Sequence, residues 1–322
     1  MNEQEFIEFK ELFDQWAKHN SKDIPKRVVD TNVNKILKAY AREYKELLNF
    51  LIANIDDLLA NDTIKALEIE ATLRQFEGRI NQINGTVSAE VTKGVTQAYL
   101  AGVLIDNAGM VTFDRVNTYK AEQLIKDTME DLLYATENTK RGVKKIIRDV
   151  VAKQSQLHAL KSEHSTEVAK AILSQLSRKT IQERLKKEGF VGIIDKAGRK
   201  WNLKTYIDMV IRTKNNQAYH EGLKDSMDIR ATDLARISTH KADDACVNFE
   251  GLIISMQGQT KGYLTYDELK ATGMIFHPNC KHSCYPVNKI ELLHDDYIKV
   301  HEEQSKKLKE LLKKSNRHSS KK

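Results

Sequence analysis

The chain contains no proline between Pro25 and Pro278, a span that covers most of its 322 residues. Proline interrupts helices more strongly than any other residue, because it lacks a backbone N–H and its ring clashes with the preceding turn. The long gap therefore permits uninterrupted helices. Charged residues make up 30% of the chain and glycine contributes only 14 residues, a composition typical of long helices bathed in solvent. We expect a mostly α protein.

Two long amphipathic patterns support this expectation. Apolar residues recur at spacings of three and four from Val33 to Leu59, and again from Tyr119 to Val151, which places each set on one face of a helix. Long one-faced helices are stabilised mainly by packing against each other. The pattern predicts an elongated domain over residues 1–165, built as a long N-terminal helical bundle.

Between these two patterns the sequence predicts a pair of shorter helices. Residues 67–83 and 87–104 both have helical apolar spacing, and the dipeptide Asn84-Gly85 lies between them. Asn-Gly is a strong turn signal, because both residues tolerate a left-handed backbone. We therefore expect a break at this point.

The region from 166 to 290 has short elements instead. Phe190–Ile194 and Arg199–Trp201 flank a turn sequence at Asp195–Gly198, which predicts a β-hairpin. Leu234–Ser238 and Leu252–Met256 are two further predicted strands. We expect a small α+β unit in this part of the chain.

Helix-capping signals occur in the same region. Thr180–Glu183 and Thr265–Glu268 have the spacing of capping boxes, in which the threonine oxygen and the glutamate carboxylate satisfy free amides of the first turn. Asn202 is placed to cap a helix over Leu203–His220.

Residues 291–322 form a third predicted segment, a basic helical tail. The net charge of the chain is +7, and the stretch from Gln304 onward carries eight lysines and arginines against one glutamate. Such a tail suits contact with a polyanion such as DNA, although a solvated terminal helix would have the same composition. The candidate nucleic-acid-binding residues are Lys306, Lys307, Lys309, Lys313, Lys314, Arg317, Lys321 and Lys322.

Three cysteines occur in the whole chain, and all lie in its last quarter together with several histidines. An odd and small number of cysteines rules out a disulfide framework and is typical of a protein made in a reducing cytosol. Thiolate and imidazole groups are the ligands of structural zinc, whereas the alternative is that the thiols are small buried groups. The candidate metal ligands are His240, Cys246, His277, Cys280 and Cys284, with His282 as a neighbour.

Signatures of catalysis are weak. The sequence has no P-loop, dinucleotide-binding, zincin or nucleophile-elbow motif. Cys246 lies near His240 and two aspartates, which supplies the residue types of a thiol nucleophile but no more. Arg212 within a predicted helix suits a structural ion pair, with Asp208 as the nearest partner. We expect no enzyme, no signal peptide and no membrane anchor.

Four blocks of the region 170–290 together resemble the minor capsid protein family of tailed bacteriophages, which is related to the Mu F-like head morphogenesis proteins. Their order and spacing carry the resemblance. The blocks are Gly189–Leu203, Tyr206–Thr213, Ile237–Cys246 with Glu250-Gly251, and Gly273 with His277–Ser283 and Tyr285-Pro286.

The resemblance implies a structural protein of the phage head, made in the host cytoplasm and located in the virion at the portal vertex or head interior. Its implied partners are the portal protein and the capsid and scaffold proteins. Packaged DNA is a further expected partner, which rests on the charge of the basic tail alone. Its implied roles are procapsid assembly and DNA packaging or ejection, without catalysis. We expect no cofactor, and the structural zinc rests on the Cys/His residues alone. The alternatives are a toxin-like or metal-dependent enzyme built on the C-terminal unit, and a DNA-binding protein outside any virion.

Overall fold

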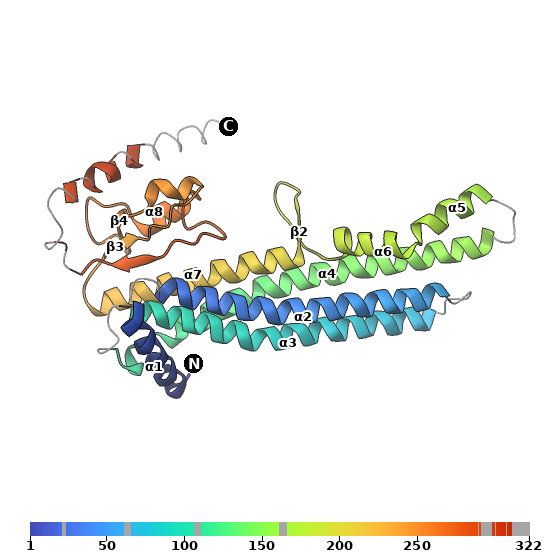
Figure 1. Cartoon of the computed structure of the whole chain (residues 1–322), viewed down its shortest axis with the longest axis horizontal. Helices are drawn as coiled ribbons and strands as arrows, with labels where there is room; N and C mark the ends of the chain where they lie inside the picture. The colour runs from blue at the N-terminus through green and yellow to red at the C-terminus, as the bar shows by residue number, and fades with distance from the viewer. Residues whose placement is uncertain are drawn as a thin grey trace. The chain divides into compact units, whose positions relative to one another are not determined.

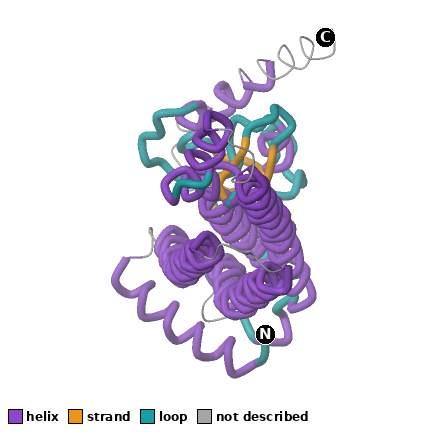
Figure 2. The backbone as a smooth tube through the Cα atoms, turned by 90° about the vertical axis from the view of Figure 1, so that its right-hand side faces the viewer, coloured by secondary structure: helices purple, strands orange, loops and turns teal. Residues whose placement is uncertain are grey.

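A computed structural model shows a predominantly helical protein in which strands occupy only a small region (Figure 2). The prediction of a mostly α fold with a small α+β unit is confirmed. None of the helices in the described part of the chain is long and apolar enough to cross a membrane. The described residues are 1–20, 24–60, 66–105, 111–160, 166–288, 290, 298–299, 301–306 and 308–310.

The longest helices lie almost entirely within the proline-free part of the sequence (Figure 1). Their bounds are α2 (Ile24–Ala60), α3 (Ala66–Leu104), α4 (Thr118–Leu160) and α7 (Leu203–Ile229), and the shorter α1 (Glu3–Asn20) precedes them.

The predicted break at Asn84-Gly85 is wrong, because α3 runs through it without interruption. Gly85 is exposed, while Ile83 and Val87 beside it are buried. Asn84 donates a hydrogen bond to Thr136 of α4 instead of turning the chain. A glycine inside a helix costs only about 1 kcal/mol relative to alanine, which the burial of its apolar neighbours offsets.

Two compact units make up the chain. We call residues 34–92 and 126–211 the helical unit, and residues 1–33, 93–125 and 212–322 the mixed unit. The predicted domain boundaries at residues 165 and 290 stay a prediction.

In the helical unit, the apolar stripes predicted from the sequence form the core. Within this unit α2, α3 and α4 run side by side (Figures 1 and 2). Leu133 departs from the prediction, since its side chain is 42% exposed at the edge of the α4 stripe. The principal buried residues are Ile36, Tyr40, Leu47, Leu51 and Ile55 of α2, Phe76, Ile80, Ile83, Val87 and Val91 of α3, and Leu132, Val143, Ile146, Ile147 and Val150 of α4.

A predicted hairpin completes the helical unit and is confirmed. Strands β1 (Val191–Ile194) and β2 (Lys200–Asn202) pair antiparallel. Asp195 closes the turn, because its Oδ1 accepts the backbone N–H groups of Ala197 and Arg199 at 3.0 and 2.9 Å. Its Oδ2 accepts the indole N–H of Trp201 at 3.0 Å. The aspartate therefore satisfies the turn locally.

The helix before this hairpin starts earlier than its sequence predicts. α5 (Thr166–Gln175) is followed by α6 (Arg178–Arg184), whose N-cap is Ser177, not Thr180. The Ser177 hydroxyl accepts the backbone N–H of Thr180. Serine and threonine are both good caps, so the sequence alone did not separate the two positions. A π-helical turn, η3 (Leu185–Gly189), follows α6.

Helix α7 begins as predicted but ends later. Asn202 accepts the backbone N–H of Lys204 and so caps the helix. The predicted end at His220 is wrong, since α7 continues to Ile229. Gly222, which would suit a helix end, lies inside α7 at a crossing with α3, where Gly102 faces it.

This crossing brings two backbones into direct contact within the mixed unit. A Cβ on Gly222 would lie 1.9 Å from the carbonyl oxygen of Tyr99, and one on Gly102 would lie 2.1 Å from that of Tyr219. Only glycine fits at either position.

The mixed unit also contains the predicted strands. Its sheet has the order β4-β3-β5 and is antiparallel throughout, with β3 (Leu234–Ile237) between β4 (Ile253–Ser255) and β5 (Cys284–Pro286). The capping box at Thr265–Glu268 is confirmed and opens α8 (Tyr266–Ala271). The short strands leave long connections, and these carry Cys246, Cys280, His240, His277 and His282.

Candidate functional site

A tight turn at His277-Pro278-Asn279-Cys280 forms the centre of the Cys/His cluster. The backbone N–H of Cys280 donates to the carbonyl of His277 at 2.9 Å, and Asn279 has a φ of +66°. Proline at the second position and asparagine at the third are the residues that a type II turn favours. The sequence therefore brings His277 and Cys280 to the two ends of one turn.

Helix α7 holds this turn in place. The backbone N–H of Asn279 donates to the hydroxyl of Thr213, and the Asn216 amide donates to the carbonyl of Cys280. The neighbouring Arg212 forms an ion pair with Asp30 at 3.7 Å. Arg212 and Thr213 thus both have structural contacts. The partner of Arg212 shown here is Asp30, and the expected pair with Asp208 stays a prediction.

The short 3₁₀ helix η4 (Ala245–Phe249) supplies the next thiol. Asp244 is its N-cap and accepts the backbone N–H of Cys246 at 2.9 Å. The Cys246 side chain is buried, and its Sγ lies 3.2 Å from Nε2 of His277 and 3.8 Å from Sγ of Cys280. The fold therefore brings η4 and the turn at 277–280, which are separated by about thirty residues, into contact through the Cys246 sulfur and the His277 nitrogen.

His282 lies on the segment that leads into β5 and is also buried. Its Nδ1 is 3.4 Å from Sγ of Cys280, and its Nε2 is 3.2 Å from a carboxylate oxygen of Glu250. Burial lowers the pKa of His282, and the nearby His240 lowers it further, against the opposing effect of Glu250. The imidazole is neutral at neutral pH and has one donor and one acceptor nitrogen.

Glu250 organises the loop beside this histidine. Its carboxylate accepts the backbone N–H groups of His240, Lys241 and Ala242 at 3.0, 3.2 and 3.0 Å. Burial alone would raise the pKa of Glu250, but these donors and His282 outweigh it and lower the pKa to about 2. The carboxylate is therefore ionised and fixed by hydrogen bonds.

The electrostatics do not resemble those of a cysteine nucleophile. Burial raises the pKa of the Cys246 thiol, and Asp244 and Cys280 raise it further. Burial likewise raises the pKa of Cys284. Reactive cysteines have the opposite shift, because neighbouring positive charge stabilises their thiolates.

The structure thus brings three of the five predicted ligands, Cys246, His277 and Cys280, together with His282. His240 is exposed, and its ring stacks on that of His282 with centroids 4.0 Å apart. Cys284 lies buried in β5, where its carbonyl accepts the hydroxyl of Tyr219 at 2.7 Å.

One sequence signal pointed to His282. An extended segment places alternate side chains on the same side, which would put Cys280 and His282 on one face. The same alternation would also place Cys284 on this face. Sequence alone does not show that β5 begins at Cys284 and so separates it from the cluster.

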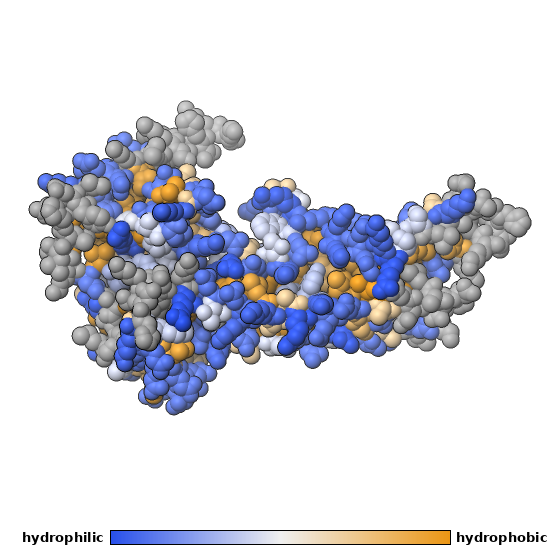
Figure 3. Space-filling model, in the orientation of Figure 1, coloured by the Kyte–Doolittle hydropathy of each residue, from blue (hydrophilic) through white to orange (hydrophobic). Residues whose placement is uncertain are grey.

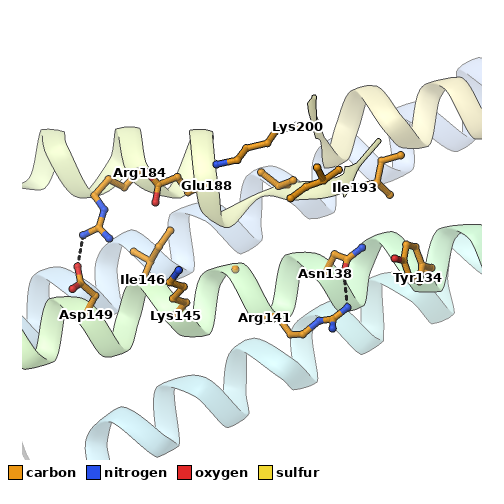
Figure 4. A pocket seen from close by; sticks show the side chains of 13 residues that line it. Tyr134, Asn138, Arg141, Lys145, Ile146, Asp149, Arg184, Glu188, Ile193 and Lys200 are labelled. Atoms are coloured by element: carbon orange, nitrogen blue, oxygen red, sulfur yellow. Dashed lines mark hydrogen bonds and ion pairs between the residues drawn. The ribbon is translucent and has the colours of Figure 1, made fainter. Parts of the chain in front are cut away.

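A second site, which the sequence did not predict, is an open pocket of about 550 Å³ in the helical unit (Figure 4). Its lining comes from α4, α6, η3 and the hairpin, with cationic side chains from Arg141, Lys145, Arg184 and Lys200. Arg184 is paired with Asp149 at 2.7 Å, as Figure 4 shows. The lining residues are far apart in the sequence, so no local motif marks the pocket.

The basic tail is described only in part. Lys306 is exposed, and Lys309 donates to the carbonyl of Gly262 at 3.0 Å. The other predicted DNA-binding residues, Lys307, Lys313, Lys314, Arg317, Lys321 and Lys322, lie outside the described residues.

Comparison with protein families gives one match. The family model of phage minor capsid protein 2 matches residues 63–319, which is most of the chain. No curated protein and no solved structure matches the chain.

Proposed function

Because the chain belongs to the phage minor capsid protein 2 family and is thus a structural capsid protein of a phage, we propose that it acts inside the head at the portal vertex. There it assists procapsid assembly and the packaging or ejection of DNA. Its partners are the portal protein and the capsid or scaffold proteins, and its role is structural, not catalytic. The family match over residues 63–319 is the observation that carries this proposal.

The long helices support a scaffolding role. Their surface is largely hydrophilic on the face shown in Figure 3, with scattered apolar patches. Exposed apolar side chains of the helical unit include Leu133, Tyr134 and Ile194. Apolar side chains scattered singly are normal on a protein surface, so the support comes from the length of the helices and not from these residues.

The tail supports a contact with DNA. Positive charge is concentrated from Gln304 onward, while the rest of the chain is close to neutral. Lysine and arginine beside phosphates release condensed counterions, so DNA binding through this tail should depend steeply on salt.

Particle composition tests the location. Mass spectrometry of purified virions and procapsids should find the chain at low copy number relative to the major capsid protein. Cross-linking within intact particles should connect it to the portal protein. If it is absent from both particle types, or cross-links only to the outer surface of the shell, the proposed location is wrong.

DNA binding is tested separately. The variant in which the eight lysines and arginines from Lys306 to Lys322 are changed to glutamine keeps the tail length but removes its charge. The slope of log K against log salt should fall by several units, since each phosphate contact contributes about 0.9 on duplex DNA. A control variant changes exposed lysines outside the tail. An equal slope in the tail variant and the wild type would remove DNA as a partner.

A further inference from the structure

We propose that Cys246, His277, Cys280 and His282 bind one zinc ion in a tetrahedral Cys₂His₂ site. This set differs from the sequence prediction, because it includes His282 and excludes His240 and Cys284. The proposal does not depend on the location of the protein in the phage particle.

The distances among three of the four ligand atoms fit a tetrahedral site, and the fourth ligand, His277, contacts one of the three. With Zn–S bonds of about 2.3 Å and Zn–N bonds of about 2.0–2.1 Å, two sulfurs should lie about 3.8 Å apart and a sulfur and a nitrogen about 3.5 Å apart. The two Sγ atoms of Cys246 and Cys280 are 3.8 Å apart. Sγ of Cys246 lies 3.2 Å from Nε2 of His277, and Sγ of Cys280 lies 3.4 Å from Nδ1 of His282. The ligand atoms of Cys246, Cys280 and His282 all lie within 4.8 Å of one another, whereas His277 is close to Cys246 and Asp244. The imidazole of His277 therefore has to turn toward Cys280 and His282 to complete the tetrahedron.

In both imidazoles, the ring nitrogen that does not face a thiol has a hydrogen-bond acceptor beside it, which also supports a metal site. Nδ1 of His277 lies 2.8 Å from the carbonyl oxygen of Pro278, which can only accept, so this nitrogen is the donor. That bond leaves the lone pair of Nε2 facing Cys246. Metal-binding histidines characteristically donate their other N–H to a carbonyl or a carboxylate.

His282 has the reverse arrangement with the same result. Its Nε2 donates to the carboxylate of Glu250 at 3.2 Å, which leaves the lone pair of Nδ1 facing Cys280. Glu250 is itself fixed by three backbone N–H groups. The orientation of this ligand is therefore set by a carboxylate–histidine pair, as in many zinc sites.

The ligand types select zinc and a structural role. Two thiolates and two imidazoles in a tetrahedron favour zinc over the hard cations calcium and magnesium, which prefer oxygen. Four protein ligands leave no position for a water or a substrate, which is the arrangement of structural sites.

The local fold explains what the ion would do. The site connects η4 with the turn at 277–280 and the adjoining segment that enters β5, and the connection between η4 and the turn is long and carries β4 and α8. The strands of this sheet are only three or four residues long. Strands this short form few hydrogen bonds with each other, so a metal ion that ties their connections together would stabilise this part of the fold.

Asp244 is the strongest competing ligand. One of its carboxylate oxygens lies 3.4 Å from Nε2 of His277. Its other oxygen caps η4 by accepting the backbone N–H of Cys246. The variant Asp244→Asn keeps the cap but removes the charge, so it separates the two roles.

Metal analysis of the full chain tests the site. The wild-type protein, purified from zinc-supplemented cells without chelator, should contain about one zinc per chain. Cys246→Ser, Cys280→Ser and His282→Ala should lose it. His277→Ala should lose it as well, whereas His277→Cys should keep it. The matched controls His240→Ala, Cys284→Ala and Asp244→Asn should keep about one zinc each.

Cobalt substitution gives a readout that does not depend on the variants folding. Cobalt(II) bound to the wild-type chain should show the intense visible bands of a tetrahedral site and a thiolate-to-metal charge-transfer band. A folded wild-type protein that holds neither zinc nor cobalt would overturn the proposal. Zinc that survives Cys280→Ser but is lost in Cys284→Ala or His240→Ala would overturn the ligand assignment.

Discussion

The crossing of α3 and α7 at Gly102 and Gly222 offers the sharpest test of the packing in the mixed unit. In Gly102→Ala, the new Cβ would lie 2.1 Å from the carbonyl oxygen of Tyr219 and 2.6 Å from the backbone nitrogen of Leu223. Real Cβ atoms essentially never approach other atoms closer than 3.0 Å. The obstacles are backbone atoms, which cannot rotate away as a side chain can.

The size of the effect follows from two opposing contributions. Relief of the overlap requires the helices to separate locally by about 1 Å, and overpacking of this kind costs about 1–3 kcal/mol or more. Alanine regains about 1 kcal/mol of helix propensity over glycine. We expect Gly102→Ala to destabilise the protein by up to about 2 kcal/mol, and by more if the overlap cannot be relieved. The double variant with Gly222→Ala should cost less than the sum of the two, because one separation relieves both overlaps.

Helix α3 provides matched controls. Gly78 and Gly85 are exposed positions on the same helix, and a Cβ at either would meet no atom within 4 Å. Gly78→Ala and Gly85→Ala should therefore stabilise the protein by up to about 1 kcal/mol. Urea unfolding of the full chain, followed by far-UV circular dichroism, measures all five variants: the three single or double changes at Gly102 and Gly222 and the two controls. If Gly102→Ala is as stable as Gly85→Ala, the close approach of the two helices is refuted.

Three further changes should alter stability in stated directions. Burial, reinforced by two nearby lysines, lowers the pKa of His220 to about 3, so this histidine stays neutral in the folded protein while its unfolded form takes up a proton near pH 6.5. The contribution of the neutral His220 to the free energy of unfolding is complete above about pH 6.5 and falls by about 1.4 kcal/mol per pH unit below it. Urea unfolding at a series of pH values should show this slope, and His220→Gln should make it shallower. Asp225→Asn removes a carboxylate that accepts from Tyr99 and Lys120, both at 2.5 Å, and should cost about 1–3 kcal/mol in thermal unfolding, whereas an unchanged midpoint would mean that the contact contributes nothing. Thr265→Ala removes half of a capping box and should cost about 1 kcal/mol, seen as faster amide exchange confined to α8.

The sequence predicted the elements that local physics determines. Apolar periodicity and the lack of proline were sufficient for α2 and α4, and a capping box located α8 at Thr265. The hairpin was also predictable, because Asp195 satisfies its own turn. In each case the signal and the structure that it produces lie within a few residues of each other.

The misses have a tertiary cause. Gly85 and Gly222 both had the sequence signature of a helix end, yet one is a solvent-facing helical residue and the other a helix contact. Whether such a glycine ends a helix, faces solvent or contacts another helix depends on what lies opposite it in space, and sequence spacing does not contain that information. His282 was missed as a member of the cluster for a similar reason, since its orientation depends on Glu250, which lies 32 residues away.

The link between Tyr99 and Asp225 has a consequence for how the protein is made. These two side chains are separated by 126 residues, so the α3 segment leaves the ribosome well before its partner in α7 exists. At roughly 5–20 residues per second, the wait lasts roughly 6–25 s. During that interval the face of α3 around Gly102 lacks its partner helix, and host chaperones have time to bind it.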